Sequence, residues 1–493
     1  MALNKNRDAA VLYINHERHE VRGEEAFMML ADYLRYKRGL VGTKIVCAEG
    51  DCGACSVLKA SYLNGRSEGF EVINACIISV AQLDACQIVT VEGLSEGGQL
   101  SAVQESVAAC HASQCGYCTP GFVVAITACL ESGKKDLNEQ KIKNCLTGNL
   151  CRCTGYTSLI EAALKAQPSV QLSASLASRY LPDDRQKDLK AIAGIPLEIS
   201  FGDKTFCAPV LLKDALQLRS KMPLTLMASG SDLGVMINKG KANPKTQLSL
   251  HLLPDLYKID QDQNRLTFGA RVTLTELRKI CEKTVPEFAK FLNIFASPQI
   301  KNIGTLVGNV ANASPIGDTV PFLMVADTLV HVASSRGTRN IPLTEFYLAY
   351  RKMSLEADEI IASVSFAIPK QEDRLRIFKV SQRKDLDIST VNSAFLFRMK
   401  DDHPSVVSEA RIAYGGIGPV IRRFPAVETF LVGKALEPKV IDQALGMIQG
   451  DILPLSDVRG TSAYRRNLVD GMFRRFCEEL GQKATHQGAE QHV

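Results

Sequence analysis

Residues 47–55 read CAEGDCGAC, and this stretch places Cys47, Cys52 and Cys55 within one short loop. A fourth cysteine, Cys76, follows further along the chain. The whole sequence of 493 residues holds 15 cysteines, and most of them lie between positions 47 and 153. An odd number of cysteines, in a chain that opens without an apolar signal segment, argues against a disulfide framework. The first third of the chain is therefore chemically different from the rest.

The spacing C-x4-C-x2-C with a distant fourth cysteine is that of plant-type ferredoxins. Two irons need four thiolates in one small volume, which a tight loop and an adjacent strand can supply. Gly50 and Gly53 allow the loop to turn and to approach a cluster closely. Structural zinc is the alternative, but zinc sites more often use paired C-x2–4-C motifs. We therefore predict that a 2Fe–2S cluster binds to the following thiolates: Cys47, Cys52, Cys55 and Cys76.

A second set of cysteines lies downstream in two close pairs, Cys115 with Cys118 and Cys151 with Cys153. Taken alone, these pairs suit tetrahedral zinc slightly better than a cluster. Their position directly after a ferredoxin-like segment favours a second 2Fe–2S cluster instead. Both pairs lie at expected helix ends, where the positive end of the helix dipole favours a thiolate. We interpret the remaining cysteines as ordinary buried residues: Cys86, Cys110, Cys129, Cys145, Cys207, Cys281 and Cys477.

Hydrophobic periodicity predicts the elements around these motifs. Apolar residues at 11–14 lead into a polar turn and a second strand, which indicates a hairpin, and residues 25–36 have helical spacing. Four short helices are expected at 100–111, 121–130, 139–146 and 156–166, the third with a capping box formed by Asp136 and Glu139. The segment after residue 167 is rich in Ser, Ala and charge, which indicates a linker.

One loop has the composition of a nucleotide site. The segment 224–234, LTLMASGSDLG, runs from a short apolar strand into small residues whose backbone amides could cradle a pyrophosphate. Alone, it is better explained as a plain strand and turn. No G-x-G-x-x-G motif or Walker loop occurs in the sequence, so a Rossmann or P-loop site is not supported.

Both cysteine blocks in this order, with QCGYCTPG at 114–121 and NLCRCTGY at 149–156, resemble the iron–sulfur module of the xanthine oxidase family. A further loop, FASPQIKNIGTLVGN at 295–309, and the 224–234 loop resemble the flavin domain of the same molybdenum hydroxylases. The resemblance spans residues 9–480. It departs at Val307, where relatives commonly carry glycine, and at Asp51, where they often have glycine.

The resemblance implies two 2Fe–2S clusters and FAD, with the second cluster next to a molybdenum cofactor. It also implies roles for individual residues. Phe295 and Asp318 would flank the nucleotide, Ile361 would line the pocket, and Lys379 would reach the flavin. The pyrophosphate and ribityl region would be held by Leu226, Met227, Ala228, Ser229, Gly230, Ser231, Asp232 and Leu233, together with Thr305 and Asn309. A solvated charge is an equally good interpretation of Lys379 alone.

From these features we expect a multidomain α+β chain. Residues 1–95 would form a β-grasp, ferredoxin-like domain and residues 96–166 a four-helix iron–sulfur domain, followed by a linker at 167–194. A two-part α+β FAD-binding domain would span 195–372, a C-terminal α+β domain 373–480, and a disordered tail 481–493.

Composition excludes several classes of function. Hydrophobic residues make up 46% and charged residues 23% of the chain, as in ordinary globular proteins. The net charge of +5 is spread thinly, without a basic block, which argues against a nucleic-acid partner. The longest apolar stretches are about half the length of a membrane-spanning helix. We expect a cytoplasmic protein with no membrane association.

The fused order of ferredoxin, helical and flavin domains matches the xanthine dehydrogenase branch of the family. It implies electron transfer from molybdenum through both clusters to FAD and NAD, in oxidation of hypoxanthine and xanthine to urate. The molybdenum cofactor would belong to a large molybdopterin-binding partner subunit, in a heterotetramer or a larger hetero-oligomer. Two alternatives remain open: the same architecture acting on an aldehyde or another N-heterocycle, and a zinc-binding or redox regulator without turnover.

Overall fold

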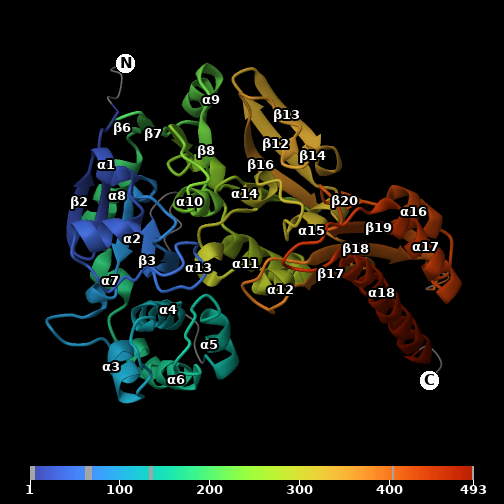
Figure 1. The fold of residues 1–493 in the computed structure, drawn as a ribbon, viewed down its shortest axis with the longest axis horizontal. Helices are drawn as coiled ribbons and strands as arrows, with labels where there is room; N and C mark the ends of the chain where they lie inside the picture. The colour runs from blue at the N-terminus through green and yellow to red at the C-terminus, as the bar shows by residue number, and fades with distance from the viewer. Residues whose placement is uncertain (1–5, 62–68, 133–136, 402, 404, 491–493) are drawn as a thin grey trace. The chain divides into compact units, whose positions relative to one another are not determined.

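The structure, a computed structural model, describes residues 6–61, 69–132, 137–401, 403 and 405–490 (Figure 1). The chain divides into two compact units. The first unit holds residues 1–257 with the short segments 273–275 and 296–305. The second unit holds residues 258–272, 276–295 and 306–493. The multidomain α+β class predicted from the sequence is confirmed.

The first unit begins with a five-stranded mixed sheet in the order β2-β1-β5-β3-β4. Its strands are β1 (Ala10–Ile14), β2 (Glu17–Val21), β3 (Ser56–Ser61), β4 (Glu71–Asn74) and β5 (Cys86–Val89). β1 and β2 form the expected antiparallel hairpin, while β5 runs parallel to β1. This is the β-grasp arrangement, in which the first and last strands lie side by side at the centre.

The two faces of this sheet bury different partners, because successive side chains of a strand point to opposite faces. Val57 of β3 belongs to one apolar cluster, which it shares with residues of three short helices. These are α1 (Gly23–Phe27), α2 (Leu30–Asp32) and a π-helix, η1 (Tyr33–Lys37). The next residue, Leu58, belongs to a second cluster that contains Phe122 and Ile126 of the helical domain. The sheet is therefore covered on both sides.

The expected four-helix domain consists of α3 (Ala102–Ala109), α4 (Thr119–Glu131), α5 (Glu139–Cys145) and α6 (Thr157–Leu172). Ser101 caps α3 in a capping box with Gln104. The cap of α5 is Asn138, whose side chain accepts a hydrogen bond from the backbone of Lys141. The capping box predicted with Asp136 lies outside the described residues; Asn138, two residues further along, is the N-cap of α5.

The segment 167–194, interpreted from its sequence as a linker, is mostly helical. After α6 come α7 (Leu176–Tyr180) and α8 (Asp183–Ala193). Tyr180 and Leu189 are fully buried, and Arg185 Nη1 donates a hydrogen bond to Gln87 Oε1 at 2.9 Å. The segment is therefore packed against the ferredoxin-like sheet. Its few apolar side chains were too widely spaced in the sequence to reveal these short helices.

The first unit ends with a four-stranded sheet in the order β6-β7-β9-β8. Its strands are β6 (Leu197–Phe201), β7 (Lys204–Ala208), β8 (Thr225–Met227) and β9 (Thr246–Ser249). Two helices lie within this part of the sequence, α9 (Leu212–Lys221) and α10 (Ser231–Asn238), whereas α13 (Pro298–Lys301) packs against β4 of the ferredoxin-like sheet. Phe206 and Leu252 share an apolar cluster with Ile73 of the ferredoxin-like sheet, so these parts have one continuous core.

The second unit contains a five-stranded antiparallel sheet in the order β10-β11-β16-β12-β13. The strands are β10 (Ile259–Gln261), β11 (Arg265–Gly269), β12 (Leu329–Ser334), β13 (Gly337–Pro342) and β16 (Ile360–Ala367). Other elements here are α11 (Leu274–Thr284), α12 (Pro286–Ile294), α14 (Leu306–Ala311), α15 (Val320–Val325), β14 (Tyr347–Ala349) and β15 (Lys352–Met353). In its core Phe288 and Phe322 stack, and Phe366 meets both rings edge-on.

A second sheet of this unit has the order β17-β18-β19-β20. It contains β17 (Arg374–Val380), β18 (Val391–Met399), β19 (Val407–Gly415) and β20 (Arg422–Arg423), and three helices pack beside it, α16 (Pro425–Leu431), α17 (Pro438–Asp451) and α18 (Ser462–Glu490) (Figure 1). The tail expected to be disordered from residue 481 is helical to Glu490, while residues 491–493 lie outside the described part. The turn of α18 that contains Phe476 packs into the apolar core of this unit. The helix continues from that turn through a stretch without proline.

The described part of the chain contains no helix that is both long and apolar enough to cross a membrane.

Candidate cofactor sites

The first cysteine set lies at the end of the ferredoxin-like sheet. Cys47 and Cys52 occupy the loop that precedes β3, and Cys55 is the residue directly before that strand. β3 pairs antiparallel with β4, and the Ala75 N–H donates to the Cys55 carbonyl at 3.2 Å. This pairing brings Cys76, which follows β4, next to Cys55. The loop-plus-strand arrangement expected from the spacing is therefore present.

The sulfur atoms of this set lie within hydrogen-bonding range of one another. Contacts with the Cys52 and Cys76 thiols, followed by backbone N–H donors, lower the pKa of Cys47. Those donors are the amides of Glu49 and Cys52, each 3.4 Å from Cys47 Sγ. Contact with the Cys76 thiol lowers the pKa of the buried Cys55, whose sulfur also accepts from Asn74 Nδ2 at 3.6 Å. The set supplies donors that would stabilise thiolates.

Glycine is required at one position of this loop by conformation and by space. Gly53 has φ +71°, a left-handed conformation that other residues adopt at a cost. A Cβ added there would lie 2.2 Å from the Gly148 carbonyl oxygen, which belongs to the loop of the second cysteine set. The two cysteine loops are therefore in backbone contact.

The second cysteine set lies where two helices of the helical domain begin. Cys118 is the N-cap residue of α4, and Cys151 and Cys153 precede α6. Cys153 Sγ lies 3.7 Å from Cys115 Sγ, and Cys118 contacts Cys151. Cys115 and Cys153 are exposed, whereas Cys151 is buried. All four thiols converge although the pairs are more than thirty residues apart in the sequence.

The thiols of this second set have unequal acidities. Burial, and then the neighbouring Cys151, raise the pKa of Cys118 to about 12. Burial opposes ionisation of Cys151 too, but hydrogen bonds from Thr154 and from the Cys153 backbone lower its pKa to about 7. The Thr154 and Cys153 amides each lie 3.4 Å from Cys151 Sγ. These donors would stabilise Cys151 as a thiolate for metal binding.

In the second set the thiols associate as pairs, Cys115 with Cys153 and Cys118 with Cys151. In the first set the contacts form a chain, because Cys47 contacts both Cys52 and Cys76, and Cys76 also contacts Cys55. A 2Fe–2S cluster needs four thiolates in one small volume, which each set supplies. No group of three His, Cys, Asp or Glu side chains suited to one metal ion occurs among the residues that the structure describes.

The 226–233 loop of the first unit connects β8 to α10. Gly230 is the N-cap of α10 with φ +72°, and an added Cβ would lie 2.7 Å from Gln82 Nε2. Gln82 in turn donates a hydrogen bond to the Ser229 carbonyl at 2.9 Å. The helix N-terminus offers unpaired backbone N–H groups, which favour a phosphate. This geometry fits the predicted pyrophosphate loop.

Thr305 is the last residue of the first unit. Thr305 is buried, directly follows Gly304, and forms a bridge with Thr273. The Gly304 carbonyl accepts a hydrogen bond from the Leu274 amide at 2.9 Å. These contacts fix the backbone at the start of the 305–309 segment.

In the second unit, three of the expected flavin residues form one cluster. Lys379 Nζ lies 2.6 Å from Asp318 Oδ2 and 5.9 Å from the centre of the Phe295 ring. Asp318 also accepts hydrogen bonds from Asn392 Nδ2 at 3.0 Å and from the Ser389 hydroxyl. The Lys379 side chain is only 2% exposed, so the interpretation of a solvated charge is wrong.

The remaining flavin residues of this unit lie elsewhere in it. Asn309, on α14, accepts a hydrogen bond from the Thr319 hydroxyl at 2.7 Å. Because Thr319 follows Asp318, Asn309 is linked to the Lys379 cluster through one residue. Ile361 lies on β16 opposite Val332, in a different sheet from Lys379. The structure therefore groups Phe295, Asp318 and Lys379 closely, with Asn309 beside them.

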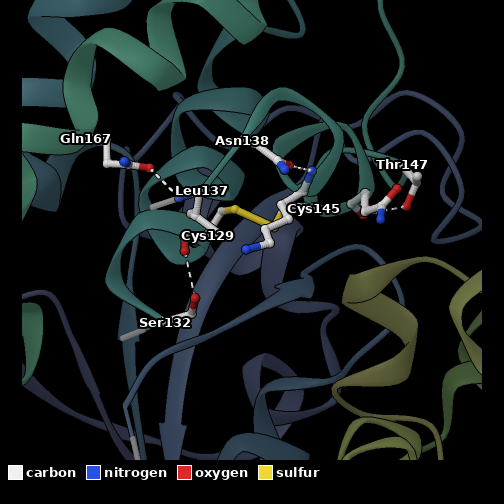
Figure 2. Close-up of a disulfide and its surroundings, with 9 residues drawn as sticks. Cys129, Ser132, Leu137, Asn138, Cys145, Thr147 and Gln167 are labelled. Atoms are coloured by element: carbon white, nitrogen blue, oxygen red, sulfur yellow. Dashed lines mark hydrogen bonds between the residues drawn. A yellow bond between two sulfur atoms is a disulfide. The ribbon is translucent and has the colours of Figure 1, made fainter. Parts of the chain in front are cut away.

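Two cysteines interpreted as ordinary buried residues are instead joined. Cys129, near the end of α4, and Cys145, at the end of α5, form a disulfide (Figure 2). One hydrogen bond near it joins the segment before α5 to α6, because the Leu137 amide donates to Gln167 Oε1 at 3.1 Å. The expectation was wrong here because helix packing, which the sequence does not show, aligns the two side chains.

Sequence reasoning missed the polar residues that connect the two cysteine loops. The Leu150 amide donates to the Cys52 carbonyl at 3.0 Å, and Asn149 Nδ2 donates to the Gly53 carbonyl at 3.0 Å. Because Leu150 directly precedes Cys151, its hydrogen bond joins the loop of the second cysteine set to Cys52 of the first set. Adjacency to the cysteine motif was the signal that could have identified Asn149.

Three family models match the chain. Residues 90–164 match a [2Fe-2S] binding domain, residues 200–371 the FAD binding domain in molybdopterin dehydrogenase, and residues 376–480 the CO dehydrogenase flavoprotein C-terminal domain. These matches cover both units and follow the order of domains expected from the sequence.

Similar proteins are longer than this chain. Xanthine dehydrogenase 1 of Arabidopsis thaliana is 30% identical over 95% of this chain and 39% of its own length. Xanthine dehydrogenase/oxidase of Gallus gallus is 27% identical over 98% of this chain and 41% of its own. The chain thus spans about two fifths of the length of these curated relatives.

Solved structures share the fold of part of the chain. Quinoline 2-oxidoreductase from Pseudomonas putida 86 has a TM-score of 0.52 and 24% identity, covering 58% of this chain and 99% of that one. Carbon monoxide dehydrogenase from Hydrogenophaga pseudoflava has a TM-score of 0.52 and 23% identity, covering 55% and 94%.

Proposed function

Because this chain belongs to the xanthine oxidase family of molybdenum hydroxylases, whose iron–sulfur and flavin domains it carries, we propose that it is an electron-transfer subunit. Electrons would enter from a molybdenum site on a partner subunit, pass through two 2Fe–2S clusters to FAD, and leave on NAD. The proposed overall reaction is oxidation of hypoxanthine and xanthine to urate. The proposed location is the cytoplasm.

The observation that carries this proposal is the direct backbone contact between two four-thiol sets. Electron transfer needs redox centres held at a fixed, short separation in a rigid frame. The hydrogen bond from the Leu150 amide to the Cys52 carbonyl joins the two cysteine loops in this way. A regulator that only stored zinc would have no need for its two metal sites to share backbone contacts.

The first cluster would be held by Cys47, Cys52, Cys55 and Cys76, and the second by Cys115, Cys118, Cys151 and Cys153. When bound, the clusters supply one-electron transfer, and the protein positions and tunes them. The chain's own contribution is the set of donors aimed at sulfur. Asn74 Nδ2 reaches Cys55, and the Thr154 and Cys153 amides reach Cys151. Such donors stabilise the anionic form of a cluster and raise its reduction potential.

Residues 226–233, Thr305 and Asn309 are proposed to hold the pyrophosphate and ribityl region of FAD. Phe295 and Asp318 are proposed to flank the nucleotide, Ile361 to line the pocket and Lys379 to reach the flavin. Lys379 and Asp318 form a buried ion pair, which would keep a cation at a defined position beside the flavin.

The proposed partner is a large molybdopterin-binding subunit, in a heterotetramer or a larger assembly. The second cysteine set supports this, since Cys115 and Cys153 are exposed and could face a partner's redox centre.

A second candidate keeps the architecture and changes the substrate to an aldehyde or another N-heterocycle. The fold similarity to quinoline 2-oxidoreductase makes that alternative concrete. The two candidates share every role proposed for this chain and differ only in the pocket of the partner subunit.

The division of labour between subunits can be tested with this chain alone. We expect the purified chain to reduce an artificial dye with NADH through FAD. We also expect it not to oxidise xanthine, because the three matched models describe iron–sulfur and flavin domains, and we assign the molybdenum site to the partner. Dye reduction and xanthine oxidation are measured by absorbance, with protein freed of molybdenum. Xanthine turnover by this preparation would contradict the proposal of a partner subunit, and absence of NADH-dependent dye reduction would contradict NAD as the acceptor.

A further inference from the structure

The side-chain amide of Gln299, in the 295–309 loop, is hydrogen-bonded to residues beside both cysteine loops. Gln299 lies on α13, in the segment 296–305 that belongs to the first unit, and it is completely buried. Its Nε2 donates to Asn149 Oδ1 at 2.8 Å, to Ser56 Oγ at 3.1 Å and, more weakly, to the Gly148 carbonyl at 3.4 Å. Its partners thus come from the ferredoxin-like and the helical domains.

These partners are themselves bound to the first cysteine loop at one residue. Asn149 Nδ2 and Ser56 Oγ both donate to the Gly53 carbonyl, at 3.0 Å and 2.7 Å. Gly53 lies between Cys52 and Cys55, while Asn149 lies two residues before Cys151. Gln299 therefore closes a ring of hydrogen bonds that has one cysteine loop on each side.

The ring has almost no free space around it. A Cβ added at Gly148 would lie 1.8 Å from Gln299 Oε1, and one added at Gly121 would lie 2.3 Å from the Gly53 carbonyl oxygen. Protein interiors packed this closely transmit small changes of side-chain shape to their neighbours. A change at Gln299 should therefore move the two cysteine loops relative to each other.

The simplest alternative is that Gln299 only fills a polar hole in the core. Its Oε1 is buried and has no hydrogen-bond partner among the described residues. A buried polar atom without a partner is unfavourable, so a side chain chosen for stability alone would avoid it. The amide is useful here for its Nε2 donor, which points at both cysteine loops.

We propose that Gln299 is a positioning residue that fixes the separation of the two cysteine loops and thereby sets the rate of electron transfer between the two clusters. This inference rests on the proposed function, because it requires both 2Fe–2S clusters. Gln299 touches neither the thiols nor any reacting atom. It acts through Asn149, Ser56 and Gly53.

The test uses the full chain with Gln299→Met, which keeps the length of the side chain and removes its donor. Electron paramagnetic resonance of the fully reduced protein reports the magnetic coupling between the clusters, and flash reduction reports the rate at which an electron redistributes between them. We expect weaker coupling and a rate about tenfold lower, because sub-ångström to ångström misplacement of reacting centres is costly. The signal shape of each separate cluster should persist.

The matched control is Asn302→Leu in the same segment. Asn302 is also a buried amide, but it donates to the Val72 carbonyl at 2.8 Å and accepts from the Thr275 hydroxyl at 2.6 Å, away from the cysteine loops. We expect this variant to keep wild-type coupling and rate. Equal slowing in both variants would show a general loss of rigidity and would overturn the inference.

A milder variant decides the question if Gln299→Met loses a cluster. Ser56→Ala removes one acceptor of Gln299, so it should slow electron transfer in the same direction by a smaller factor. Unchanged coupling and rate in a variant that retains both clusters would overturn the role of Gln299. A wild-type chain that holds only one cluster, by iron analysis, would instead overturn the proposed function on which the inference rests.

Discussion

Replacing Cys151 with serine should reduce the iron content of the purified chain from about four to about two atoms, the stoichiometries of two clusters and of one. Cys151 is buried, and hydrogen bonds that outweigh its burial lower the pKa of its thiol to about 7. Serine cannot supply a comparable thiolate. One electron paramagnetic resonance signal should disappear, and the signal of the first cluster should remain.

The control for this change is Cys110→Ser. Cys110 lies in the same helical domain as the C-cap of α3, and its thiol belongs to neither convergent set. That variant should keep both signals and all of the iron. If Cys151→Ser retained about four irons, or lost one zinc and no iron, the assignment of the second site to a 2Fe–2S cluster would be wrong.

Replacing Gly230 with valine should remove FAD while both clusters remain. Gly230 has φ +72°, which a β-branched residue adopts only with strain, and its added Cβ would lie 2.7 Å from Gln82 Nε2 and 3.1 Å from Met227 Cε. A left-handed conformation alone costs about 1–2 kcal/mol, so we expect FAD affinity to fall by about tenfold or more. Flavin absorbance and iron analysis of the same sample measure the two cofactors.

The matched control is Gly240→Val, a few residues beyond the end of α10. Gly240 has φ +65°, so the conformational strain is similar, but an added Cβ there meets no atom within 4 Å. This variant should retain FAD. If Gly230→Val bound FAD with wild-type affinity, the 226–233 loop would not be the pyrophosphate site. If it lost iron as well, the shared core of the first unit would have been disrupted.

The sequence predicted the sites whose residues are close in the chain or follow a fixed spacing. C-x4-C-x2-C with Cys76 identifies one set because three of its members share a loop, whose geometry depends on local residues such as Gly50 and Gly53. The thiols converge as predicted. The second set was less certain, since two close pairs are also typical of zinc sites.

The sequence could not predict contacts between distant segments. Gln299 is separated from Asn149 and Ser56 by 150 and 243 residues, and no periodic pattern links them. The Cys129–Cys145 disulfide was missed for a similar reason, because it depends on how α4 packs against α5. Burial also decided between the two interpretations of Lys379, because its side chain is 2% exposed and paired with Asp318, which excludes a solvated charge.

The interpretation of residues 167–194 as a linker between separate domains was the least reliable expectation. The sequence of β3, SVLKAS, likewise does not reveal what covers each face of its sheet. One face of the ferredoxin-like sheet is covered by the helical domain. The other face shares an apolar core with residues of the β6-β7-β9-β8 sheet. The cofactor sites of the first unit therefore share one rigid frame, which is why a change at Gln299 is expected to affect both clusters.

The central claim is that the chain carries electrons between NADH, FAD and two 2Fe–2S clusters. It is tested most directly by mixing the purified chain with NADH and recording electron paramagnetic resonance spectra over time. The account predicts that flavin absorbance bleaches and that two distinct 2Fe–2S signals appear, one of which is absent in Cys151→Ser. A colourless, zinc-containing protein with no signal, or oxidised clusters that NADH does not reduce in FAD-loaded protein, would contradict it.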